Sequence, residues 1–252
     1  MVTSVPYVVE DECKRPPTLG VVVLQSEETL EDEFRYFLRD RRVVLHHTRI
    51  PSGEAVTFES LSNMESHLAD AVGLFPATAK FDVIGYACTS ASSVIGEERI
   101  TELIAAARPN TVSTNPATAG KAALDALGVR RVALLTPYNV AVTRDIVRMF
   151  EKGGFEVIDV FTFDEETEER VARISSYSIL EAAVDAGASD GAEAVFISCT
   201  NLQCADIIAA AERRLGKPVL SSNLVLFWHM LQLANVDTCG ITESRLLELG
   251  YS

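Results

Sequence analysis

Two cysteines of this 252-residue chain occupy the same local context. Cys88 ends the apolar stretch of "DVIGYACTSAS", Cys199 ends that of "EAVFISCTNLQ", and a threonine follows each of them. A thiol at the end of a parallel strand, just before a helix, meets backbone N–H groups and the positive end of the helix, which favour thiolate over thiol. The sequence therefore predicts two reactive thiols in equivalent places of two similar units.

Paired thiols that face one small ligand can perform two kinds of chemistry. In the first, one sulfur removes a proton from a carbon and the other donates a proton from the opposite face, which inverts that carbon. In the second, a thiolate adds to an activated double bond, the new single bond rotates, and elimination isomerises the alkene. The positions of Cys88 and Cys199 in the sequence do not choose between the two.

Strands and helices alternate along the first half of the chain. Apolar runs predict buried strands at "LGVVVLQ", "RVVLHHTRI" and "FDVIGYAC". Apolar residues at helical spacing predict helices at residues 28–38, 61–75 and 97–107. The residues before Thr18 are expected to form an arm.

The same alternation restarts at Ala117. Strands are predicted at "RRVALLTPY", "FEVIDVFTF", "AEAVFISC" and "KPVLSSN", and helices at residues 117–127, 142–152, 179–186, 205–215 and 226–234. Such alternation predicts parallel sheets, so the expected fold is α/β, with two pseudo-symmetric domains that each hold a parallel sheet flanked by helices. We expect the first domain to comprise residues 18–113 plus 219–252 and the second to comprise 114–218. Both cysteines then lie at carboxyl ends of strands, where ligands of such sheets bind.

Composition excludes some classes of partner. Thirty-six acidic and 22 basic side chains give a net charge of −14, which repels nucleic acid. No apolar run approaches the ~20 residues of a membrane span, and the N-terminus lacks a signal-peptide pattern, so we expect a cytoplasmic protein that does not contact membranes. The oligomeric state is left open, with a homo-oligomer among the alternatives.

The cysteines are expected to be free thiols, because they number five and no secretory signal is present. They lack paired CxxC spacing, and the four histidines make no helical HxxxH pair, so no metal is predicted. Cys13, Cys204 and Cys239 lack the Cys-Thr context, and we interpret them as packing residues.

Three segments together resemble a known family: "GYACTSAS" around Cys88, "LLTPY" ending at Tyr138, and "ISCTNLQ" around Cys199. On a duplicated α/β chain, they are similar to the aspartate/glutamate racemase superfamily. Within it, the branch of maleate cis-trans isomerase, arylmalonate decarboxylase and the ectoine-utilisation proteins is the most similar. The resemblance covers about residues 19–248.

The resemblance implies a small carboxylate substrate, bound without cofactor or metal in a cleft between the two domains. Cys88 and Cys199 match the catalytic pair, and Tyr138 matches a tyrosine that contacts substrate. The decarboxylase resembles this chain but keeps only the second cysteine, so the presence of Cys88 favours a racemase or isomerase. The residues after the thiols could offer donors to a substrate oxygen: Thr89, Ser90, Thr200 and Asn201.

One position departs from the maleate isomerase pattern. Where that enzyme has an "SSNTT"-like segment, this chain reads "QSEETLEDE", which places Glu27 at the position of a substrate-contacting asparagine. A carboxylate there would repel a second substrate carboxylate and attract an amine. We therefore expect Glu27 to contact substrate; the alternative is that it only stabilises the start of a helix.

These observations predict an isomerase that acts on a small amino-acid or ectoine-derived carboxylate by two-cysteine proton transfer. One alternative is maleate cis-trans isomerisation through a covalent cysteine adduct. Decarboxylation, simple carboxylate binding without turnover and a Cys-His thiol hydrolase are the others. Outside the Cys motifs, Asn115 is expected to cap a helix, and the acidic run "FDEETEER" is interpreted as a solvated helix start. The resemblance also implies a polar substrate contact in this acidic region, which it does not assign to one residue.

Overall fold

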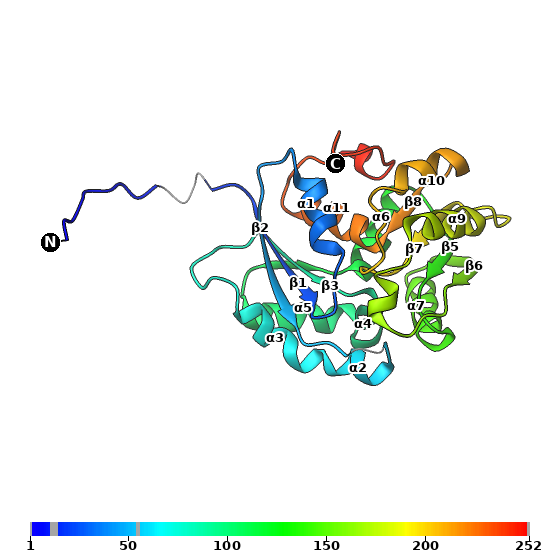
Figure 1. The fold of residues 1–252 in the computed structure, drawn as a ribbon, viewed down its shortest axis with the longest axis horizontal. Coiled ribbons are helices and arrows are strands. Elements are labelled where there is room, and N and C mark those ends of the chain that lie inside the picture. The colour runs from blue at the N-terminus through cyan, green and yellow to red at the C-terminus, as the bar shows by residue number, and fades with distance from the viewer. Residues whose placement is uncertain (1, 11–14, 54–55, 251–252) are drawn as a thin grey trace.

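Two parallel four-stranded sheets of the same design form the framework of the molecule (Figure 1). The structure is a computed structural model that describes residues 2–10, 15–53 and 56–250. Across the first sheet the strands are β2 (Val44–Ile50), β1 (Thr18–Leu24), β3 (Val83–Ala87) and β4 (Val112–Thr114). Across the second they are β6 (Glu156–Thr162), β5 (Arg131–Thr136), β7 (Ala194–Ile197) and β8 (Val219–Ser221). Across each sheet, the second strand in sequence order therefore comes first, followed by the first, third and fourth strands.

Helices cover both faces of the first sheet. Gly20 of β1 lies in register with Ile84, so Gly20 and Gly85 face opposite sides of the sheet. Gly20 lies against Phe75 at the end of α3, and Gly85 lies against Met230 of α11. The helices that belong to this sheet are α1 (Leu30–Leu38), α2 (Phe58–Asn63), α3 (Glu65–Gly73), α4 (Thr89–Ile95), α5 (Glu97–Ala107) and α11 (Ser222–Leu233).

The second sheet is covered in the same way. Gly120 packs on Phe196 of β7, and Gly187 packs on the neighbouring Val195, whose side chain points to the opposite face. The helices around this sheet are α6 (Pro116–Ala126), α7 (Val140–Lys152), α8 (Glu168–Val171), α9 (Ser176–Gly187) and α10 (Ile208–Leu215). Helix α11 packs along α6, so the end of the chain joins the two units (Figure 1).

The predicted α/β fold is confirmed, with differences in short elements. The single helix expected over residues 61–75 is wrong: the chain forms α2 and α3, which meet at Met64. Leu61, Leu68 and Val72 are all buried, so the apolar pattern continues across the break and hides it. Strand β4 and helix α4 were not predicted, because three and seven residues are too few to show a clear period.

The predicted boundaries between the domains stay a prediction. At the second boundary, β8 is hydrogen-bonded to β7, so the second sheet extends past residue 218 to Ser221. The predicted arm is seen in residues 2–10, which are exposed and run away from the body (Figure 1). Within the described ranges, no helix has the length and apolar character needed to span a membrane.

The cysteines outside the two motifs differ in burial. Cys204 is buried, as expected of a packing residue. Cys239 is exposed, so its interpretation as a packing residue is wrong; it lies in the surface turn that follows α11. Cys13 lies outside the described residues.

Candidate active site

Cys88 directly follows β3 and is the N-cap residue of α4. Its backbone is extended, and its sulfur accepts a hydrogen bond from the backbone N–H of Ala91 at 3.3 Å. The Ser90 hydroxyl lies 3.5 Å from the same sulfur. The thiol thus takes the place of the serine or aspartate oxygen that usually caps a helix.

Cys199 lies two residues after the end of β7, in the corresponding position of the second sheet. Its sulfur accepts a hydrogen bond from the backbone N–H of Asn201 at 3.3 Å. The Tyr138 hydroxyl also hydrogen-bonds this sulfur and lowers the pKa of the thiol. Cys88 and Cys199 are 3% and 2% exposed, so both side chains are buried.

Burial disfavours the thiolate form of both cysteines, contrary to the expectation that thiolate is favoured. Burial raises the pKa of Cys88 to about 12, although the hydrogen bonds from Ser90 and Ala91 lower it. Burial also raises the pKa of Cys199 well above its ordinary value. The predicted donors are present, but the cost of removing a sulfur anion from water is larger than their effect.

Glu27 accepts hydrogen bonds at the start of α1, as the alternative interpretation expects, and its predicted contact with substrate stays a prediction. Its Oε1 accepts hydrogen bonds from the backbone N–H of Thr29 and of Leu30, each at 3.0 Å, and from the Thr29 hydroxyl at 3.1 Å. The other oxygen, Oε2, is buried and has no hydrogen-bond partner among the described residues. One half of the carboxylate is therefore structural, and the other half remains available to a ligand.

Glu168 is the residue that the sequence interpretation missed. It begins α8 inside the acidic run "FDEETEER", yet it is only 7% exposed, so the interpretation of this run as a solvated helix start is wrong at this position. Burial, followed by the charge of Glu27, raises the pKa of Glu168 to about 7. No local pattern distinguishes Glu168 from its exposed acidic neighbours, because its burial depends on distant segments.

Asn201 forms hydrogen bonds with both the loop that carries Glu27 and the start of α8. Its side-chain nitrogen donates to Glu168 Oε2 at 3.0 Å and to the backbone oxygen of Ser26 at 3.2 Å. Its side-chain oxygen accepts from the backbone N–H of Glu28 at 2.9 Å. With these partners, Asn201 positions the loop that carries Glu27 against Glu168, and its predicted role as a substrate contact stays a prediction.

The other predicted contacts lie at the junction between the units. The Thr89 hydroxyl donates to Ser222 at 2.7 Å, and the Thr200 hydroxyl donates to the backbone oxygen of Ala87 at 3.4 Å. Thr200 thus links its cysteine segment to the other unit, whereas Thr89 binds the start of α11, which packs on its own sheet. Ser90 contacts the sulfur of Cys88, and its predicted role in substrate binding, like those of Thr89 and Thr200, stays a prediction.

Electrostatics place both thiols in one neighbourhood. The charges of Glu27 and Glu168 raise the pKa of Cys88 and of Cys199. Burial raises the pKa of Tyr138 well above its ordinary value, and both thiols add to that shift. The predicted residues Cys88, Cys199, Tyr138 and Glu27 are therefore brought together, and Glu168 joins them.

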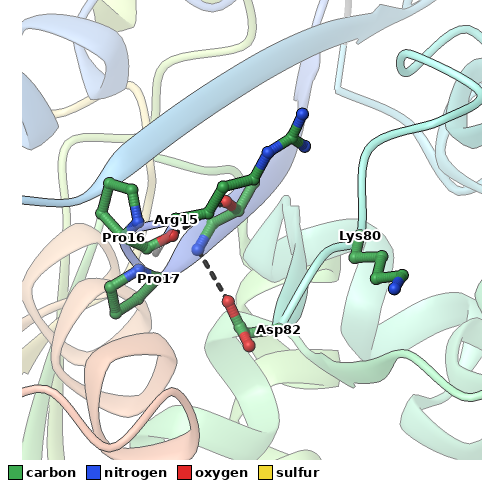
Figure 2. Close-up of a pocket in the computed structure, with 6 residues that line it drawn as sticks. Arg15, Pro16, Pro17, Lys80 and Asp82 are labelled. Carbon is green, nitrogen blue, oxygen red and sulfur yellow. Dashed lines mark hydrogen bonds between the residues drawn. The ribbon is translucent and has the colours of Figure 1, made fainter. Parts of the chain in front are cut away.

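Cavities and metal-binding clusters are the other kinds of candidate site in the described part of the chain. A cavity of about 290 Å³ lies beside Thr18 and Asp82, at the start of β1 and just before β3, so it is at the opposite edge of the sheet from Cys88 (Figure 2). In the described ranges, no group of three or more His, Cys, Asp or Glu residues is arranged to hold a metal ion. The prediction of a site without metal or cofactor stays a prediction.

Residues 62–247 match the arylmalonate decarboxylase family. The chain belongs to this family. The match confirms the predicted resemblance, and two relatives agree with it. Maleate isomerase from Pseudomonas putida is 27% identical over 252 residues, covering 92% of this chain and 98% of the relative. Arylmalonate decarboxylase from Bordetella bronchiseptica is 33% identical over 122 residues, covering 48% and 51%.

Solved structures agree with the family and with the fold. A maleate isomerase variant from Pseudomonas putida S16 with bound maleate has 25% identity and a TM-score of 0.83, and the match covers 92% of this chain and 97% of that one. A maleate cis-trans isomerase variant from Nocardia farcinica holds a covalently bound succinylcysteine intermediate. Its identity is 27% and its TM-score is 0.83, with 92% and 98% of the chains covered. This arylmalonate decarboxylase family member thus shares its fold with one maleate isomerase that holds a covalent cysteine intermediate and with another that binds maleate.

Proposed function

We propose that this chain is a cofactor-independent isomerase that interconverts the cis and trans forms of a small unsaturated carboxylate through a covalent cysteine adduct. The observation that carries the proposal is the pair of buried thiols, Cys88 and Cys199, at equivalent strand ends in one electrostatic neighbourhood. The relatives named maleate isomerase, and the succinylcysteine in one of them, favour this chemistry over the predicted racemisation.

The two thiols are suited to different steps because their surroundings differ. Cys88 caps α4, so the positive end of this helix and the hydrogen bonds from Ser90 and Ala91 can stabilise a thiolate, and we assign it as the nucleophile. The charge of Glu168 is the largest electrostatic contribution to the raised pKa of Cys199. A thiol held protonated in this way can serve as the proton donor.

The reaction then balances without any added reagent. The Cys88 proton passes to the Glu168 carboxylate, whose charge acts on this thiol, and Glu168 holds that proton while the adduct exists. The sulfur bonds to the β-carbon, the π electrons move to the α-carbon beside the carboxylate, and Cys199 protonates that carbon. After rotation about the single bond, Cys199 removes the proton, the carbon–sulfur bond breaks, and the double bond re-forms. Each proton returns to its donor.

A second candidate function is racemisation of an amino-acid or ectoine-derived substrate by proton transfer between the same two thiols. The unpartnered oxygen of Glu27 favours it, since a buried carboxylate suits a substrate with an amine. Both candidates use Cys88 and Cys199, and they differ in the bond that changes.

Proton NMR in heavy water distinguishes the candidates. The protein is incubated with maleate, with cis-4-aminobut-2-enoate and with a panel of amino acids and N-acetyl diamino acids. We expect cis-to-trans conversion of an unsaturated acid. Exchange and inversion at the α-carbon of a saturated amino acid, without alkene conversion, would replace this function by racemisation. Carbon dioxide release from an arylmalonate would replace it by decarboxylation.

A further inference from the structure

The carboxylate of Glu27 is only half satisfied inside the protein. Oε1 accepts three hydrogen bonds from the first turn of α1, whereas Oε2 has no partner among the described residues. The residue is 4% exposed, so water does not solvate this oxygen freely. A buried carboxylate oxygen without a donor is unfavourable, and a ligand that carries a donor would remove the penalty.

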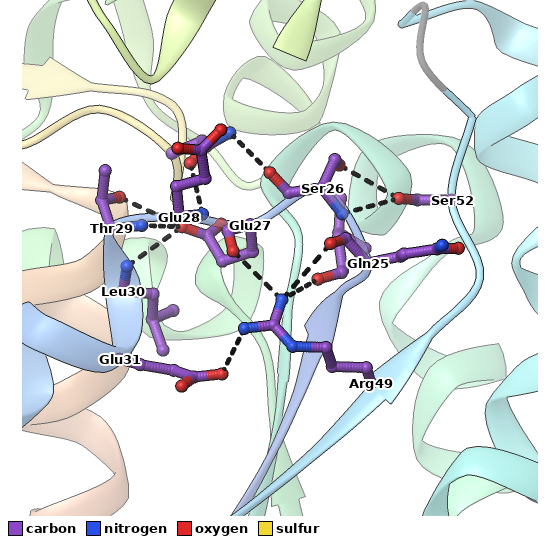
Figure 3. Close-up of polar contacts among 11 residues, drawn as sticks. Gln25, Ser26, Glu27, Glu28, Thr29, Leu30, Glu31, Arg49 and Ser52 are labelled. Atoms are coloured by element: carbon purple, nitrogen blue, oxygen red, sulfur yellow. Dashed lines mark hydrogen bonds and ion pairs between the residues drawn. The ribbon is translucent and has the colours of Figure 1, made fainter. Parts of the chain in front are cut away.

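Nearby arginines do not neutralise this carboxylate. Arg49 donates to the backbone oxygens of Leu24 and Glu27 at 2.8 and 3.0 Å, and its other terminal nitrogen pairs with Glu31 at 2.7 Å (Figure 3). Arg173 pairs with Glu28 at 3.3 Å, on the exposed side of the same loop. The charge of Glu27 therefore acts on the interior site, where it raises the pKa of both thiols.

Glu168 brings a second carboxylate to the same place. Asn201 holds Glu168 Oε2 at 3.0 Å while it binds the backbone on both sides of Glu27, at Ser26 and Glu28. The two carboxylates repel each other, and the charge of Glu27 therefore raises the pKa of Glu168. A ligand between them and the thiols meets two acidic groups that come from different units of the fold.

We propose that Glu27 Oε2 and the Glu168 carboxylate form a subsite for a cationic amino group, so that the substrate is a small acid with an ammonium group and not a dicarboxylate. This assignment of substrate class rests on the proposed function. An ammonium group supplies the missing donor to Glu27 and relieves the repulsion between the two carboxylates. A second substrate carboxylate would instead add a like charge beside both.

Three ligands with one carbon skeleton test the subsite. They are cis-4-aminobut-2-enoate, maleate and cis-but-2-enoate, which place an ammonium, a carboxylate or a methyl group at the same end. Binding is measured by calorimetry on the C88S variant, in which the proposed nucleophile is absent, after thermal unfolding has shown that the variant is folded. We expect the aminobutenoate to bind at least about tenfold more tightly than maleate, the range for a hydrogen bond between charged groups.

The decisive variant is Glu27→Gln in the same background. The amide oxygen can keep the three hydrogen bonds of Oε1 at the start of α1, while the NH₂ group replaces Oε2. We expect aminobutenoate affinity to fall about tenfold or more and maleate affinity to rise. General damage to the site would weaken both ligands, so it cannot produce these opposite changes. Glu28→Gln is the matched control: it removes the same charge at the next, exposed position and should leave the preference unchanged.

Each outcome bears on one proposal or the other. Tighter binding of maleate than of aminobutenoate, equal losses for both in Glu27→Gln, or no aminobutenoate binding at millimolar concentration would overturn the ammonium subsite. Isomerisation of maleate by the unmodified protein would still support the proposed function in those cases. Binding of aminobutenoate that depends on Glu27, with no turnover of any alkene, would support the subsite and overturn the isomerase.

Discussion

The two halves of the site share a framework and differ in their surroundings. Cys88 and Cys199 each follow the third strand of a sheet with the same strand order. Cys88 caps a helix that begins at the next residue, whereas α10 begins only at Ile208, nine residues after Cys199. Cys199 has Tyr138 as a hydrogen-bond partner, whereas Cys88 has Ser90. Duplication thus supplies two thiols, and the divergent loops distinguish their chemistry.

The loops after the first strand of each sheet show the same divergence. After β1, Glu27 caps α1 through one oxygen and leaves the other unpartnered. After β5, Asn139 caps α7 by accepting from the backbone N–H of Ala141 and of Val142, each at 3.1 Å, and the neighbouring Tyr138 approaches Cys199. In the first loop a single side chain caps the helix and carries the proposed ligand contact, whereas in the second loop Asn139 caps the helix and Tyr138 contacts the thiol.

The largest expected effect comes from the thiols themselves. Cys88→Ser and Cys199→Ser should each lower kcat by at least about a thousandfold, because nucleophile and proton donor act as one unit. Mass spectrometry of enzyme quenched with an alkene substrate should find a substrate adduct on Cys88 in Cys199→Ser, and none on Cys199 in Cys88→Ser. An adduct on Cys199 would reverse the assigned roles.

Glu168 should make stability depend on pH. Its pKa is about 7 in the folded protein and about 4.5 when unfolded, so between these values the folded state holds the proton more tightly. The free energy of unfolding is therefore highest below pH 4.5 and falls by about 3 kcal/mol, from this group, as the pH rises to about 7. Glu168→Gln should flatten this decrease in denaturant titrations at pH 4.5, 5.5 and 7.

Glu165 provides the control in the same segment. It is only partly exposed, and its hydrogen bond from Arg170 lowers its pKa to about 2. Its contribution is therefore present above about pH 4.5 and is lost as the pH falls toward 2. Glu165→Gln should leave the slope between pH 4.5 and 7 unchanged. An equal change of slope in both variants would show that burial of Glu168 is not the cause.

The smallest effect concerns Tyr138. Tyr138→Phe removes the hydrogen bond that lowers the pKa of Cys199, so kcat should fall by about tenfold. Ionisation of Cys199 should move to higher pH while that of Cys88 stays in place. Labelling with iodoacetamide at several pH values, followed by mass spectrometry of the two peptides, measures each thiol. Equal shifts at both cysteines would contradict the difference between the two halves.

The sequence alone determined the features that depend on neighbouring residues. Apolar runs located most strands, and the helical period gave residues 97–107, which are the bounds of α5. Asn115 before Pro116 predicted a helix cap, and its side chain accepts from the backbone N–H of Ala117 at 3.0 Å. The repeated Cys-Thr motif identified the two thiols. These signals are local because strand alternation, helix spacing and capping act over only a few residues.

Tertiary structure decided the features that depend on distance from water and on segments far apart in sequence. Glu168 looks like any residue of an acidic run until Asn201, from 33 positions away, binds it in the interior. Cys88 has the donors that favour a thiolate, yet packing on all sides raises its pKa to about 12. The free oxygen of Glu27 is visible only when its other hydrogen bonds are known. Desolvation is a property of the whole surrounding shell, so a linear pattern does not encode it.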